Sequence, residues 1–151
     1  MPGKDKVCFF NGHRDSPESL LPILIVEVER HITEYHVKEF IVGHYGNFDT
    51  LAARAVREAK RYHPDVRLTL LLPYHPAERP IELPDGFDGS LHPPMDRVPR
   101  RLAIVRANRW MVDHSDFLIA YAWYPASHAR DLVEYAQKRA KHGVPHITQL
   151  S

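Results

Sequence analysis

The sequence predicts an α/β protein, a three-layer domain in which a mainly parallel sheet of five strands carries helices on both faces. Short apolar runs alternate along the chain with segments of helical periodicity, and this alternation is typical of parallel strands joined by helical crossovers. The apolar runs are continuous rather than interleaved with polar residues, which indicates a sheet that is buried on both sides. In such a sheet we expect a ligand to bind at the carboxyl ends of the strands, where the strand order reverses.

Each predicted strand is an apolar run, and most are followed by residues that turn or stop the chain, such as Gly12, Gly43 and Pro73. Glycine and proline are the strongest local signals for the end of a strand. The predicted strands cover residues 6–10, 39–42, 66–72 and 117–122, with a weaker one at 145–150.

Apolar residues at spacings of three and four predict the helices that separate these strands. The amphipathic pattern is strongest in the helix that follows the second strand. The predicted helices cover residues 48–62, 102–114 and 129–141, with a further one inside residues 16–32.

The predicted helix ends have recognisable residues. Asn47 and Ser127 are suitable N-caps, and Gly143 is suited to end the last helix. The start of the first helix stays open, because Ser16 followed by a proline favours an early start whereas Pro22 would disrupt a helix already begun.

The chain of 151 residues is expected to form a single domain spanning residues 1–151, since domains typically hold roughly 100–200 residues. One connection, residues 74–100, is much longer than the others and holds six of the 13 prolines. A loop of this length inside a compact domain is usually functional or disordered. A lid, a subunit-contact arm and plain mobility all remain open for it.

Composition excludes several classes of protein. Twenty basic and 19 acidic residues give a formal charge of +1, which argues against binding nucleic acid mainly through phosphate charge. The single cysteine, Cys8, excludes an internal disulfide and suits a reducing compartment. No apolar run approaches the roughly 20 residues that span a bilayer, and the N-terminal segment lacks a signal-peptide core. We therefore expect a cytoplasmic protein with no membrane contact.

Polar residues follow the first two predicted strands. Gly12, His13 and Arg14 come directly after the first, where a glycine permits close backbone approach and an arginine offers a forked donor for phosphate or carboxylate. An ordinary turn with a solvated arginine explains the same residues. The turn that holds Gly43 and Gly46 leads from the second strand into a helix, and a helix N-terminus of this kind can cradle an anion.

Other candidates follow in the same region or on the third helix. Asp49 can stabilise the helix dipole or accept hydrogen bonds from a ribose. Arg106 and Trp110 lie one turn apart on the third helix and form a candidate stacked pair. Arg130 and Glu134 share a face of the last helix, where a surface ion pair is the common explanation.

The histidines raise the question of a metal site. His13, His44, His75 and His128 each follow a different predicted strand and could meet at one edge of the sheet. None of these pairs has the local spacing of zinc ligands on a helix. We expect no metal and no cofactor, and we favour hydrogen bonding or stacking against a nucleotide. Cys8 lies in a predicted buried strand, which argues against a nucleophilic role.

Three segments together have the pattern of a known family. They are Phe9-Phe10-Asn11-Gly12-His13-Arg14, then Gly43-His44-Tyr45-Gly46-Asn47-Phe48-Asp49 with the residues up to 53, and Asn108-Arg109-Trp110-Met111-Val112-Asp113 with residues 115–120. In this order they resemble the YpsA-like branch of the SLOG superfamily, Rossmann-like proteins that also include the DNA-processing protein DprA and the LOG phosphoribohydrolases. The resemblance covers nearly the whole chain.

The resemblance implies a Rossmann-like fold and a pocket for a nucleotide or nucleotide derivative. The family positions that match are Gly12, His13, Arg14, Gly43, Gly46, Asp49, Asn108 and Arg109. Two departures stand out: His44 replaces the second of two paired glycines, and Ala126-Ser127-His128 replaces a Gly-Gly-Thr. Side chains such as Ser127 and His128 would then replace backbone contacts to a phosphate, unless the pocket takes a different ligand.

The leading functional hypothesis is the binding or sensing of a small nucleotide-derived ligand in a phosphate-binding pocket. The alternative is a LOG-like N-glycoside hydrolase acting on nucleoside monophosphates, with Glu134 and Arg109 in the catalytic roles, although the glycine core of the LOG loop is missing. DNA binding as in DprA is disfavoured by the near-zero charge. Family members commonly pair through helices, so the resemblance also implies a homo-oligomer.

Overall fold

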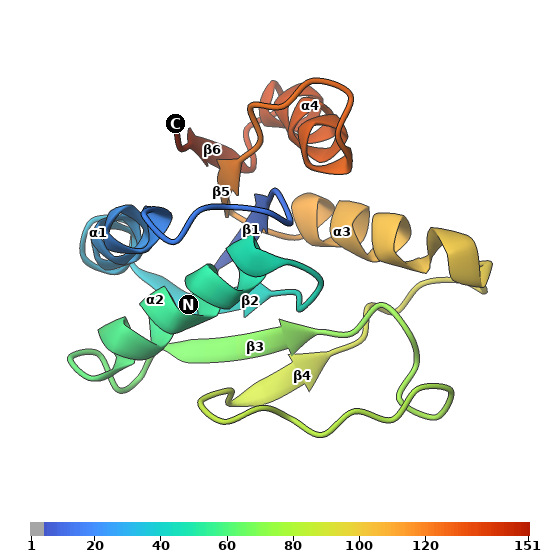
Figure 1. Cartoon of the computed structure of the whole chain (residues 1–151), viewed down its shortest axis with the longest axis horizontal. Coiled ribbons are helices and arrows are strands. Elements are labelled where there is room, and N and C mark those ends of the chain that lie inside the picture. The colour runs from blue at the N-terminus through green and yellow to red at the C-terminus, as the bar shows by residue number, and fades with distance from the viewer. Residues whose placement is uncertain (1–4) are drawn as a thin grey trace.

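The computed structural model describes residues 5–151, so residues 1–4, at the start of the segment expected to lack a signal peptide, lie outside it. In chain order the elements are β1 (Lys6–Gly12), α1 (Leu20–Thr33), β2 (Val37–Val42), α2 (Asn47–Lys60), β3 (Arg67–Leu71), β4 (Gly89–Leu91), the 3₁₀ helix η1 (Arg100–Leu102), α3 (Ala103–Asp113), β5 (Phe117–Tyr121), α4 (His128–Ala140) and β6 (His146–Gln149) (Figure 1). Within residues 5–151, no helix combines the length and apolar character that crossing a membrane requires.

The strands form one parallel sheet in the order β4-β3-β2-β1-β5-β6. β1 lies inside the sheet, with β2 on one side and β5 on the other. The strand order therefore reverses between β1 and β5, and this is where a parallel sheet of this type opens a crevice for a ligand. The predicted parallel α/β architecture is confirmed, but the predicted number of five strands is wrong, because the sheet has six.

Helices cover both faces of the sheet and bury two separate cores. On the face of α1 and α2, Phe10 and Phe40 pack with apolar residues of both helices. On the face of α3 and α4, Phe9 and Leu118 pack against Met111 and the inner side of α4. The adjacent residues Phe9 and Phe10 point into different cores, as expected for a strand whose side chains alternate between faces. This explains why the strands read as continuous apolar runs.

The helix ends differ in detail from the expected ones. α1 begins at Leu20 with Ser19 as N-cap, which places Pro22 in the first turn, where a missing N–H costs no intrahelical hydrogen bond. α2 is capped by Gly46 rather than Asn47. Ser127 caps α4 as expected, and its hydroxyl accepts a hydrogen bond from the Arg130 N–H.

The additional strand, β4, lies inside the long proline-rich connection. Asp88, just before it, accepts a hydrogen bond from the Leu68 N–H at 2.8 Å and forms an ion pair with Lys60 of α2. The Asp88 N–H in turn donates to the Leu68 carbonyl at 2.8 Å. Asp88 thus adds two hydrogen bonds and an ion pair to the parallel pairing of β4 with β3. The connection is therefore not the strandless loop that the prolines suggested.

Candidate functional site

The edge formed by the carboxyl ends of β1 and β5 is organised around His13, whose side chain is almost completely buried. Its backbone N–H donates to the Tyr121 carbonyl at 3.2 Å, and its Nε2 accepts from the Tyr124 N–H at 3.1 Å. An Nε2 that accepts a hydrogen bond leaves the proton of the neutral ring on Nδ1. His13 therefore ties the turn after β1 to the loop after β5.

Two large aromatic side chains stand exposed beside His13. Trp123 and Tyr124 follow β5 and are 61% and 56% exposed, respectively. The His13 ring meets each of them edge-on, with centroid distances of 5.6 Å to Trp123 and 6.3 Å to Tyr124. The loop turns back at Ala126, which has a φ of 61°. The aromatic pair is thus presented to solvent on a backbone fixed by hydrogen bonds.

The glycines of the two turns are required by the protein's own atoms. A Cβ added at Gly12 would lie 2.3 Å from Cγ of Phe48, and one added at Gly46 would lie 2.7 Å from Cα of Arg14. Contacts below 3.0 Å essentially never occur for a real Cβ. These two glycines therefore make room for α2 and for the turn after β1.

The expected anion cradle at the start of α2 is partly closed. The Arg14 carbonyl accepts a hydrogen bond from the Asn47 N–H at 2.8 Å. The Tyr45 N–H donates to Oδ2 of Asp49 at 3.2 Å, and the Tyr45 carbonyl accepts from Nε of Arg14 at 3.0 Å. Among residues 5–151, no carboxylate pairs with the exposed Arg14 guanidinium. The Arg14 guanidinium is thus exposed at this turn, while two of the backbone N–H groups already have partners within the protein.

Asp49 is the acidic group of this edge. A Cβ added at Gly43 would lie 3.1 Å from Oδ2 of Asp49, so the turn packs closely over the carboxyl group. Burial raises the pKa of Asp49 to about 6, and the hydrogen bond from Tyr45 lowers it by a smaller amount. Asp49 can therefore exchange a proton near neutral pH.

His44 and Tyr45 form a second aromatic pair on the turn after β2. Their ring centroids are 4.3 Å apart at an angle of 30°. Burial lowers the pKa of His44 and raises that of Tyr45, so both rings favour their neutral forms. His44 and Tyr45 thus offer a neutral stacking surface on this turn.

The structure does not bring Arg109 together with Arg14. Arg109 is exposed on α3, with its guanidinium carbon 5.0 Å from the centre of the Tyr135 ring on α4. The Tyr135 hydroxyl donates to Asp113 at the C-terminal end of α3, at 2.7 Å. This contact lies toward the amino end of β5, because α3 leads into that strand. Asn108 is partly buried on the same helix.

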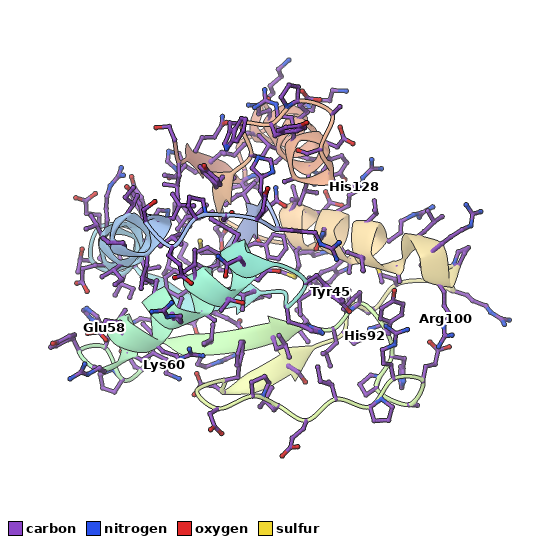
Figure 2. All side chains as sticks on the ribbon, viewed as in Figure 1. Tyr45, Glu58, Lys60, His92, Arg100 and His128 are labelled. Atoms are coloured by element: carbon purple, nitrogen blue, oxygen red, sulfur yellow. The ribbon has the colours of Figure 1, made fainter. Side chains whose placement is uncertain are left out.

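The remaining predicted residues lie at the start of α4 or within it. His128 is the first residue of this helix and is exposed, next to the N-cap Ser127 (Figure 2). Glu134 pairs with Arg130, with Nε and Oε2 3.3 Å apart. Arg109 therefore contacts Tyr135 and Glu134 contacts Arg130, and neither is seen to contact the other. The candidate pair of Arg106 and Trp110 is not among the cation–π contacts of residues 5–151, and Trp110 stacks on His114 at a centroid distance of 3.8 Å.

Neither a reactive thiol nor a group of side chains placed to hold a metal ion is found among residues 5–151. Cys8 is fully buried, and burial raises the pKa of its thiol well above the ordinary value. In the described range 5–151, there is no group of three or more histidine, cysteine, aspartate or glutamate side chains placed to hold a metal ion. The functional groups on offer are aromatic rings, Arg14 and Asp49.

No family model matches this chain, and no curated protein matches it in sequence. Solved structures do resemble it. The molybdenum cofactor binding protein of the phototrophic bacterium Rippkaea orientalis superposes with a TM-score of 0.63 at 13% identity, covering 97% of this chain and 76% of that one. DNA processing protein A (DprA) of Streptococcus pneumoniae superposes with a TM-score of 0.66 at 14% identity, covering 97% of this chain and 50% of that one.

This chain therefore spans about half the length of the DprA chain. At 13% and 14% identity the two similarities show a shared fold. DprA belongs to the superfamily that the sequence motifs resemble, so the resemblance is supported at the level of the fold. The chain has the Rossmann-like α/β fold of these proteins.

Proposed function

We propose that this protein binds a small nucleotide-derived ligand at the carboxyl edge of the sheet, at the ends of β1 and β5, as a YpsA-like member of the SLOG superfamily. The observation that carries the proposal is the exposed pair Trp123 and Tyr124 at the point where the strand order reverses. Exposure of large aromatic rings to water is unfavourable in free energy, and aromatic faces are the usual surface on which a base stacks. The similarity to a cofactor-binding protein supports a small ligand.

The charged groups of the edge fit the other parts of such a ligand. Arg14 is exposed and has no carboxylate partner among residues 5–151, so it can bind a phosphate through two parallel hydrogen bonds. Asp49, with its pKa of about 6, can accept a hydrogen bond from a ribose hydroxyl when it is ionised. The ligand would then be gripped by side chains more than by backbone amides.

The fluorescence of Trp123 tests this directly. In a Trp110→Phe background Trp123 is the remaining tryptophan of the chain, and its emission should be quenched saturably by AMP or ADP-ribose as the base stacks on it. Arg14→Ala should weaken binding at least about tenfold, because a charge-assisted hydrogen bond contributes roughly 1.5–3 kcal/mol. Isothermal titration calorimetry on the unmodified chain checks the affinities.

Arg101→Ala is the matched control, because Arg101 is also exposed and also lacks an ion-pair partner among the described residues. It should leave the titration unchanged. Absence of saturable quenching by every nucleotide tested, or an equal loss in the Arg14 and Arg101 variants, would contradict the proposal.

A further inference from the structure

A hollow lies away from the β1–β5 edge, where the proline-rich connection closes over the carboxyl ends of β3 and β4. It has a volume of about 250 Å³ and is bordered by Tyr74 and His75 after β3, by His92 after β4, and by Arg97 and Arg100 before α3. Figure 2 shows His92 and Arg100 on this side of the molecule. The pocket is therefore built almost entirely by residues 73–103.

The cations of this pocket are available. Neither Arg97 nor Arg100 forms an ion pair within residues 5–151, although Glu78 and Asp96 line the same pocket. Positive and negative side chains are thus held apart around an open space. Both arginines belong to residues 97–112, a segment with five arginines and no acidic residue. Of these five arginines, Arg97 and Arg100 line the pocket, so an anion would be favoured on the side of the pocket that these two form.

The two histidines offer complementary hydrogen-bonding groups. Nδ1 of His92 bonds the Leu72 carbonyl at 2.8 Å, so in the neutral ring Nε2 is left as an acceptor. Nδ1 of His75 accepts from the Ala77 N–H at 3.0 Å, so its Nε2 carries the proton and donates. The rings meet edge-on with centroids 5.4 Å apart. Backbone contacts therefore fix which ring nitrogen each histidine can offer a ligand.

From these contacts we propose that the pocket binds a small phosphate monoester that carries several hydroxyl groups, of the sugar-phosphate class. Arg97 and Arg100 hold the phosphate, for which arginine is suited by its forked donor geometry. Nε2 of His92 and the carboxylates of Glu78 and Asp96 accept hydrogen bonds from the hydroxyls. The volume of about 250 Å³ is below the roughly 300–1,000 Å³ of pockets for drug-sized ligands, which favours a sugar phosphate over a complete nucleotide.

Titration calorimetry with ribose 5-phosphate and glucose 6-phosphate tests the proposal, with ribose, glucose, inorganic phosphate and AMP as comparison probes. We expect at least one sugar phosphate to bind at least about tenfold more tightly than inorganic phosphate and the free sugars. Arg97→Ala and Arg100→Ala should each weaken that binding at least about tenfold, with Arg100→Lys intermediate. Thermal unfolding confirms that each variant is folded.

Two control variants identify the site. Arg101→Ala, next to Arg100 but outside the pocket lining, should bind the sugar phosphates normally. Arg14→Ala, at the β1–β5 edge, should also bind them normally. An equal loss of sugar-phosphate affinity in the Arg100 and Arg101 variants would show that only the surface charge matters, and this would overturn the proposal. Loss in Arg14→Ala alone, tighter binding of AMP at this pocket, or no saturable binding of either sugar phosphate would also overturn it. The nucleotide titrations of Trp123 are a separate measurement, so either proposal can fail without the other.

Discussion

The turns after β1 and β2 and the long connection after β3 are built in opposite ways. In the first region, glycines allow protein atoms to pack together, so that Phe48 fills the space above Gly12 and Arg14 fills that above Gly46. In the second, charged side chains such as Arg97 and Asp96 surround a pocket without pairing with one another.

The difference shows that a glycine-rich turn at a strand end is weak evidence for a phosphate site by itself. The space freed by a missing Cβ is occupied by an aromatic ring in one turn and by backbone in the other. Charged side chains that surround a hollow without pairing with one another are a better basis for proposing a ligand, because no group of the protein already occupies the space between them.

The largest loss of stability is expected on substitution of Gly12, and its absence would contradict this comparison. Gly12→Ala places a methyl group 2.3 Å from Phe48, inside the core between β1 and α2, and overpacking of this severity should cost about 3 kcal/mol or more. Gly89→Ala is the matched control, because nothing lies within 4 Å of its added Cβ. Urea denaturation of both variants measures the difference. A Gly12→Ala variant as stable as the Gly89→Ala variant would show that Phe48 does not fill the space above Gly12, and Gly12 would again be a candidate ligand-binding position.

A smaller effect is expected from the carboxyl group of Asp49. An aspartate in the unfolded chain titrates near pH 3.9, whereas the folded pKa is about 6. The folded state therefore binds this proton more tightly, and its contribution to stability is present below pH 4 and is lost as the pH rises through 6. Up to about 3 kcal/mol is involved, at about 1.4 kcal/mol per pKa unit.

Asp49→Asn should remove this dependence while keeping an oxygen that accepts from the Tyr45 N–H. The free energy of unfolding of both proteins is measured by urea denaturation from pH 4 to pH 7. As the pH rises, that of the unmodified protein should fall relative to that of the variant. Parallel pH profiles for the two proteins would show that the turn does not bury Asp49 in solution.

The smallest effect is expected at Glu134, on the opposite face of the sheet. Its side chain is 55% exposed and its ion pair with Arg130 is a surface pair within one helix, so Glu134→Gln should change stability by no more than about 0.5 kcal/mol. Chromatography of nucleoside monophosphates incubated with both proteins sharpens the result. Release of free base by the unmodified protein that disappears in Glu134→Gln would favour the hydrolase over a binding protein.

Periodicity was sufficient to predict most of the fold. The continuous apolar runs marked β1, β2, β3 and β5, because both faces of these strands are buried. β4 escaped prediction because Gly89-Ser90-Leu91 has no apolar run and is held by the side chain of Asp88. A three-residue edge strand of this kind depends on tertiary contacts that no local pattern records.

The candidate site was less predictable. The positions after β1 and β2 do lie at one edge, but position in a motif did not reveal that Phe48 and Arg14 occupy the space above the glycines. Helical spacing did not show that Arg109 stacks on Tyr135 rather than joining Arg14. The pocket before α3 was missed altogether, although the run of arginines without acidic residues between positions 97 and 112 was a usable signal.

Parallel neighbours in a sheet are usually joined by a helix that crosses over one face, yet β3 passes to β4 without one. The face of the sheet near that edge holds a depression of about 410 Å³ that includes Glu39, Arg67 and Thr69. Amide hydrogens in such a thinly covered margin should exchange with solvent sooner than those of β1. The amides of Gly89–Leu91 are therefore natural reporters of whether the connection above them tightens or loosens.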